Sequence, residues 1–125
     1  MNILWLYTGD DGRSHFADLE APLAVVDGVG ISHLLTASGV RLLEAPAGDA
    51  RDFHPAPRRQ FNVMLSGVVE LECGDGSKRR LGPGAILLAD DVSGEGHITR
   101  TVEGPRRVLQ VHLGSDIDPK AWISG

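Results

Sequence analysis

Residues 48–67, GDARDFHPAPRRQFNVMLSG, are the most informative stretch of this chain. Gly48, His54, Gln60 and Gly67 stand in this stretch at the spacing G-x5-H-x-A-x3-Q-x6-G. On both sides of it, short runs of Val, Leu and Ile alternate with clusters of glycine and proline. Such a pattern is typical of many short β-strands that form a sandwich or barrel.

The apolar runs predict a series of strands and very little helix. We expect strands near residues 3–7, 22–26, 31–36, 40–46, 51–54, 59–65, 67–73, 78–81, 85–89, 96–102 and 106–113. The clearest hairpin covers residues 68–81 and turns at an Asp-Gly pair. The run 85–89 is apolar throughout, which predicts a central strand buried on both faces. Only residues 14–19, with Ser14 as N-cap, and 118–122 favour a helical turn.

The composition indicates one domain and argues against several kinds of partner. The chain has 125 residues, 42% of them hydrophobic, and a net charge of -5, which does not suit a nucleic-acid surface. No apolar run approaches the roughly 18 residues of a membrane helix, and the N-terminus lacks a secretory signal pattern. Cys73 is the single cysteine, so it favours a reducing compartment and a packed thiol over a nucleophile. These features predict a cytoplasmic protein.

The stretch 48–67 resembles the first motif of the cupins, which is usually written G-x5-H-x-H-x3-4-E-x6-G. Ala56 replaces the second histidine of that motif, and Gln60 replaces the glutamate. Residues 84–101 resemble the second cupin motif more loosely, with His97 as its histidine and with its proline and asparagine replaced. The chain also resembles a group of small, single-domain bacterial cupin-like proteins that have no assigned reaction.

This resemblance implies a fold and an assembly. The fold would be one all-β cupin domain over residues 1–125, a jelly-roll β-barrel with little helix. Small cupins commonly pair through edge strands and N-terminal segments, so a homodimer is expected. The apolar run 3–6 would then bury its side chains against the partner.

The resemblance also implies that His54, Gln60 and His97 project into the barrel. In cupins that use a metal, two histidines, a carboxylate and a later histidine bind it. Here Ala56 contributes no ligand, and the remaining set lacks an anion. We therefore expect either no cofactor or a weakly held divalent metal (Fe, Mn, Zn or Ni) on His54, Gln60 and His97.

Other side chains are placed near this site by strand alternation. Asn62 and Met64 follow Gln60 on the same face of one strand. The last strand places Gln110 and His112 together on a polar face, which is either the cavity wall or the solvent surface. If that face is inside, His112 replaces the missing imidazole.

The remaining charged candidates lie at the edges of the two motifs. Arg58 stands at the mouth of the first motif, either to bind a substrate carboxylate or to pair with a surface acid. Arg100 is out of phase with His97 and should point away from the cavity. Asp90, Asp91 and Glu95 lie in the loop of the second motif, where we expect them to be solvated; the alternative is that one of them acts as a base at the rim of the cavity.

Three functions fit these residues. The first is a small-molecule-binding cupin with isomerase, cyclase or lyase activity, in which His54 and His97 exchange protons and Gln60 polarises a carbonyl. The second is a metal-dependent dioxygenase or lyase with an incomplete His/Gln/His site. The third is a ligand-binding or sensor module without turnover.

Overall fold

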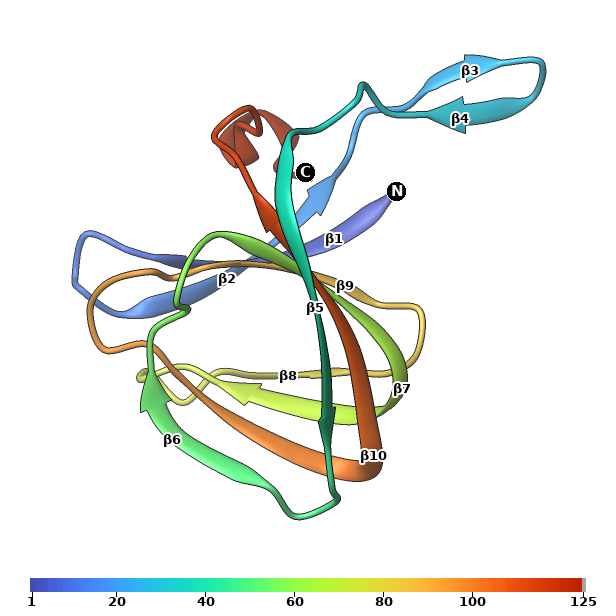
Figure 1. Cartoon of the computed structure of the whole chain (residues 1–125). Coiled ribbons are helices and arrows are strands. Elements are labelled where there is room, and N and C mark those ends of the chain that lie inside the picture. The colour runs from blue at the N-terminus through green and yellow to red at the C-terminus, as the bar shows by residue number, and fades with distance from the viewer. Residues whose placement is uncertain (125) are drawn as a thin grey trace.

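The computed structural model describes residues 1–124 and shows an all-β chain (Figure 1). Its strands are β1 (Asn2–Thr8), β2 (Ser14–Glu20), β3 (Ala24–Val26), β4 (Val29–Ile31), β5 (Ala37–Ala45), β6 (Ala50–His54), β7 (Gln60–Glu72), β8 (Lys78–Leu81), β9 (Ile86–Asp90) and β10 (His97–Leu113). The one helical element in this part of the chain is the 3-10 turn η1 (Pro119–Trp122), where the sequence predicts a single turn. No helix among these residues is long and apolar enough to cross a bilayer.

Eight strands form one mixed sheet in the order β2-β1-β9-β7-β10-β5, with β6 paired to β10 and β8 paired to β7. The long strands β7 and β10 pair with each other along most of their length, and their register shifts near the middle. Gly67 lies at this point with a φ of 77°, and a Cβ there would lie 2.5 Å from the Glu103 carbonyl oxygen. Only glycine allows the two strands to approach so closely where the sheet curves (Figure 1).

The sheet is curved, but its pairing does not close into the barrel that the sequence predicts. Among residues 1–124, β2 and β5 each have one partner strand, so both are edges of the sheet. β6 and β8 pair with the other half of β10 and of β7, and neither strand bridges the two edges. The observed architecture is therefore an open β-sheet wrapped around a cavity.

Alternate residues of β1 belong to two hydrophobic clusters. Leu4 and Leu6 pack in the inner cluster, which surrounds the cavity. Ile3 and Trp5 pack in an outer cluster together with Trp122 of η1. The apolar N-terminal run, which the sequence analysis assigns to a dimer interface, is thus buried within its own chain. β9 also contributes to both clusters, which confirms the predicted central strand.

β2 takes the place of the helical turn predicted for residues 14–19. It pairs with β1 over its whole length, and this pairing outweighs the local capping signal of Ser14. The predicted breaks near residues 66 and 103–105 are also absent, since β7 and β10 continue through them as single strands.

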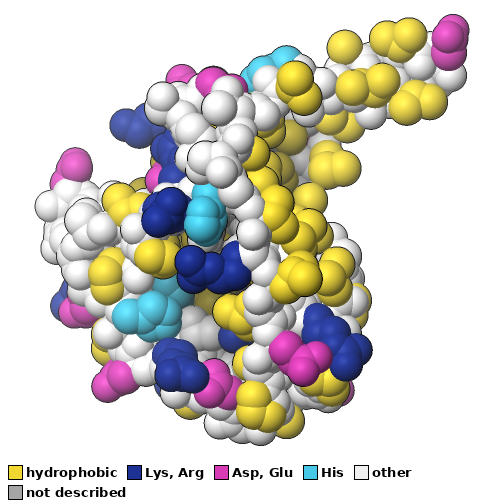
Figure 2. Space-filling model, viewed as in Figure 1, with side chains coloured by type: hydrophobic (Ala, Val, Ile, Leu, Met, Phe, Trp, Pro, Cys, Tyr) yellow, Lys and Arg dark blue, Asp and Glu magenta, His cyan; other side chains and the backbone are white. Residues whose placement is uncertain are grey.

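The hairpin of β3 and β4 projects from the body of the molecule (Figure 1). Its apolar side chains are largely exposed, and they cover the projecting arm in the space-filling view (Figure 2). The strand predicted for residues 31–36 is not formed: β4 ends at Ile31, residues 32–36 have no strand structure, and His33 lies exposed among them.

Candidate functional site

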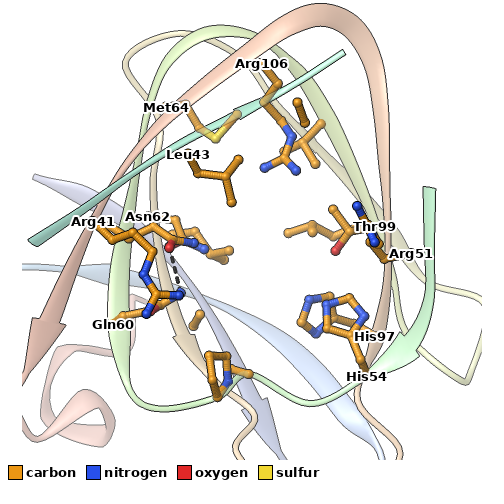
Figure 3. A pocket seen from close by; sticks show the side chains of 18 of the residues that line it. Arg41, Leu43, Arg51, His54, Gln60, Asn62, Met64, His97, Thr99 and Arg106 are labelled. Atoms are coloured by element: carbon orange, nitrogen blue, oxygen red, sulfur yellow. Dashed lines mark hydrogen bonds between the residues drawn. The ribbon is translucent and has the colours of Figure 1, made fainter. Parts of the chain in front are cut away.

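The concave side of the sheet holds a cavity of about 350 Å³ (Figure 3). The lining residues are Arg41, Leu43, Glu44 and Ala45 of β5, Asp49, Arg51 and His54 around β6, Ala56 and Pro57 after it, Gln60, Asn62, Met64, Val69 and Leu71 of β7, Leu87 and Ala89 of β9, and His97, Thr99, Arg106 and Gln110 of β10. Most positions within a strand differ by two, as expected when one face of a sheet forms the wall. Apolar side chains of the inner cluster lie between polar ones.

His54 and His97 lie side by side in this cavity. They are register partners in the antiparallel pair of β6 and β10, and their ring centroids are 4.7 Å apart. Opposed residues of such a pair place their side chains on the same face. Gly96 permits this approach because it has a φ of 79°, and a Cβ there would overlap the His54 carbonyl group. Gly96 therefore allows the backbone at His54 to approach β10 closely enough for the two imidazoles to lie side by side.

Each imidazole is oriented by a hydrogen bond that its Nδ1 atom donates to an oxygen. His54 Nδ1 lies 2.7 Å from the Asp52 carbonyl oxygen, and His97 Nδ1 lies 2.6 Å from Asp91 Oδ2. Because both acceptors are oxygens, the neutral rings carry their proton on Nδ1. The Nε2 atom of each histidine is left with its lone pair for a ligand.

Asp91 is buried rather than solvated, contrary to the sequence analysis. Its side chain is 0% exposed, and its Oδ2 accepts hydrogen bonds from both His97 and the Ser14 hydroxyl, the latter at 2.6 Å. Its Oδ1 has no partner among the described residues. Asp90 is also engaged, since Arg59 binds its carboxylate with two nitrogens at 2.9 Å. No local sequence signal marks Asp91, because Ser14 reaches it from the distant strand β2.

Gln60 and Asn62 form a polar wall of the cavity. Gln60 is 4% exposed, and its Nε2 donates a hydrogen bond of 3.1 Å to Asn62 Oδ1. Figure 3 places this pair across the cavity from His54 and His97. Met64 is 2% exposed and belongs to the inner cluster, so it contributes packing rather than a polar contact.

The other predicted ligand-binding residues contribute unequally. Gln110 lines the cavity, whereas His112 and Arg58 do not. His112 is half-buried, and desolvation together with the charges of Arg58 and Arg41 lowers its pKa. Arg58 is exposed. The structure therefore does not bring His112 or Arg58 together with His54 and His97, and the predicted use of His112 as a replacement imidazole is not supported by its position.

Sequence reasoning missed three arginines of the cavity, Arg41, Arg51 and Arg106. Arg106 shares a face with Gln110 on β10, so strand alternation connects it to a predicted residue, whereas no cavity residue was predicted on β5 from which Arg41 could be found. Arg100, by contrast, points away as predicted and binds Glu70 and Glu72.

The cavity offers two imidazoles and one neutral amide as metal donors. Gln60 is on the wall opposite the histidines (Figure 3). In the part of the chain that the structure describes, no group of three His, Cys, Asp or Glu side chains is placed to hold an ion.

Comparisons with known proteins assign no family to the chain. No family model matches it, and no curated protein matches it. One solved structure that resembles it is the crystal structure of a conserved protein of unknown function from Streptococcus pyogenes. That similarity has a TM-score of 0.49 and 19% sequence identity, over 68% of this chain and 71% of the other.

Proposed function

We propose that this chain is a small-molecule-binding cupin that catalyses a proton transfer in its cavity, as an isomerase, cyclase or lyase does. The observation that carries the proposal is the pair of imidazoles at His54 and His97, 4.7 Å apart, each held through Nδ1 and open at Nε2. The cupin-like spacing of residues 48–67 and 84–101 supports the proposal that this site belongs to a cupin jelly roll.

Two adjacent imidazoles suit general acid-base chemistry because histidine changes its charge near neutral pH. One Nε2 would take a proton from a carbon beside a substrate carbonyl, and the other ring, protonated, would return a proton to the neighbouring atom. Asp91 fixes the ring of His97 and would stabilise the imidazolium that forms. One N–H of the Gln60 amide donates to Asn62, and the other would donate to the substrate carbonyl and polarise it.

A metal-dependent reaction is the second candidate. Histidines whose Nδ1 atoms bind oxygen acceptors are typical of metal sites, and His54 and His97 have this feature. The donor set nevertheless lacks an anionic ligand and a third imidazole, which does not suit tight binding of Fe, Mn, Zn or Ni. We therefore propose that any metal is held weakly and that proton transfer does not depend on it.

Solvent deuterium exchange tests the proposed reaction directly. Small carbonyl compounds and organic acids are first screened for thermal stabilisation of the protein, which reports binding to the folded state. Each compound that binds is then incubated with the protein in D2O, and loss of its C–H signals is followed by NMR. We expect exchange that falls by about 100-fold or more in His54→Gln and in His97→Gln.

His15→Gln is the matched control, because His15 pairs with Asp11 outside the cavity. It should leave the exchange rate unchanged. Binding without exchange by the wild-type protein would contradict the catalytic proposal and favour a ligand-binding or sensor module.

We also propose that the protein is a cytoplasmic homodimer. The exposed apolar side chains of the β3–β4 hairpin support pairing, because a large apolar patch on a projecting element is unfavourable in water. The single, buried Cys73 supports a reducing compartment.

A further inference from the structure

The cavity wall carries more positive charge than its acids neutralise. Arg41, Arg51 and Arg106 line it, together with the two carboxylates of Asp49 and Glu44. Asp49 is bound by Arg51 at 3.2 Å, and Glu44 is bound by Arg107, which does not line the cavity, at 2.7 Å.

Arg41 and Arg106 therefore remain without an ion pair among the residues that the structure describes. The Arg106 guanidinium is directed into the cavity, whereas that of the exposed Arg41 lies beside Gln60 (Figure 3). In a protein whose net charge is -5, such a positive cavity attracts and orients small anions.

Arg106 is the more confined of the two. It is half-buried, and the only hydrogen bond of its side chain to a described residue runs from Nε to Thr101 Oγ1, at 2.9 Å. This bond holds the guanidinium in place and leaves its two terminal nitrogens free. Burial lowers the pKa of Arg106, and the negative charge of Asp49 acts in the opposite direction. A partly desolvated guanidinium without a charged partner is unfavourable, so a bound anion would stabilise it.

We propose that Arg106 binds the carboxylate of a small organic acid, which is the substrate class of the cavity. The proposal rests on the proposed function, because it places this acid against the imidazole pair. Guanidinium and carboxylate form two parallel hydrogen bonds, which fixes the direction of the ligand as well as its position.

The arrangement of the cavity gives this acid one orientation. Arg106 lies at one end, His54 and His97 lie at the other, and the Gln60–Asn62 pair flanks the space between (Figure 3). A ligand held by its carboxylate at Arg106 directs its far end to the two Nε2 atoms. The cavity volume of about 350 Å³ is at the lower end of the roughly 300–1,000 Å³ of ligand pockets, which suits a compact acid.

Matched acids and amides test this proposal. Malonate, succinate and glutarate are titrated into the wild-type protein, and the uncharged malonamide, succinamide and glutaramide are titrated in parallel at the same ionic strength. The side-chain 15N signal of Arg106 Nε is followed by NMR. We expect at least one dicarboxylate to shift this signal in a saturable way, and no diamide to do so. This measurement needs no variant and hence does not depend on how a variant folds.

Variants then test whether Arg106 is the residue that binds the carboxylate. Arg106→Gln should weaken binding of the dicarboxylate by about tenfold or more, because a charge-assisted pair is lost. Arg106→Lys should weaken it less, since the charge is kept and the two-point geometry is lost. Arg79→Gln is the control, because Arg79 binds Asp18 and neither residue lines the cavity. It should bind as the wild type does.

Equal shifts by acids and amides, or unchanged acid binding by Arg106→Gln, would overturn the proposal. Its failure is separable from that of the proposed function. In His54→Gln we expect acid binding to persist while deuterium exchange is lost. A protein that binds dicarboxylates through Arg106 but exchanges no proton would keep the carboxylate site and lose only the catalytic claim.

Discussion

Asp91 joins two distant parts of the chain at one oxygen atom. Its Oδ2 accepts hydrogen bonds from Ser14 and His97, and its backbone carbonyl accepts one from the Ala56 amide at 2.9 Å. The side chain that orients His97 is therefore fixed by β2 and by the segment that follows β6. We therefore expect a substitution at Asp91 to affect the His97 imidazole more strongly than the stability of the whole fold.

Replacement of Asp91 should change the tautomer of His97. In the wild type, neutral His97 should carry its proton on Nδ1, because Asp91 Oδ2 accepts it. Asp91→Asn offers a weaker, uncharged acceptor, so we expect the Nε2-protonated form to become populated. Two-bond 1H–15N NMR of the ring distinguishes the two forms. His54, whose Nδ1 binds the Asp52 carbonyl, is the internal control, and a mixture of tautomers for His97 in the wild type would contradict this account.

Cys73 should be inert at neutral pH. Burial raises the pKa of this thiol to about 11 from its usual 9.0, and the side chain is fully buried in the inner cluster. Because the folded state favours the neutral thiol, the stability that this group contributes is complete below pH 9 and is lost as the pH rises to 11. We expect a thiol reagent at pH 8 to label the unfolded protein at once and the folded protein only slowly. Rapid labelling of the folded protein would be inconsistent with this burial.

At the scale of the elements, local signals predicted some strands well and others poorly. The hairpin of β7 and β8 and the central strand β9 follow from an Asp-Gly turn and a continuous apolar run, and both are present. β2 was missed because its pairing with β1 determines it. Arg106 was missed although it alternates with Gln110 on one strand, whereas the contact of Asp91 with Ser14 depends on the tertiary fold alone.

Gly96 tests how β6 and β10 are held together. Gly96→Ala would place a Cβ against the His54 carbonyl group, in addition to the strain of a positive φ. Gly76→Ala is the matched control, since Gly76 has a φ of 85° but no atom within 4 Å of the added Cβ. The strain alone costs about 1–2 kcal/mol. We expect chemical denaturation to show a clearly larger loss for Gly96→Ala, and equal losses would mean that the close approach is absent.

In the whole molecule, the apolar side chains of the β3–β4 hairpin stay largely exposed when a single copy is considered. Val25 is 73% exposed, and Val26 and Val29 are each 57% exposed. An isolated two-stranded hairpin is only marginally stable in water, so contact with a second copy would stabilise it. The sequence predicted a dimer from the N-terminal run, but that run is buried in the chain, and the hairpin is the better candidate.

Charges on the hairpin should therefore disrupt the proposed dimer. We expect dimer mass by light scattering at micromolar concentration, and monomer mass for the double variant Val25→Asp, Val29→Asp. Val92→Asp is the control, because Val92 is 50% exposed on a different part of the chain. A monomer in the wild type would contradict the proposed assembly.

We propose that His54 and His97 transfer protons in this cavity without a tightly bound metal. The most direct measurement is deuterium incorporation into an organic acid that binds the cavity, by protein dialysed against EDTA and shown by elemental analysis to be free of transition metals. We predict that the wild type retains its full exchange rate and that His97→Gln loses it. Loss of exchange in the wild type on dialysis, with recovery when one equivalent of a divalent metal is added, would contradict the account.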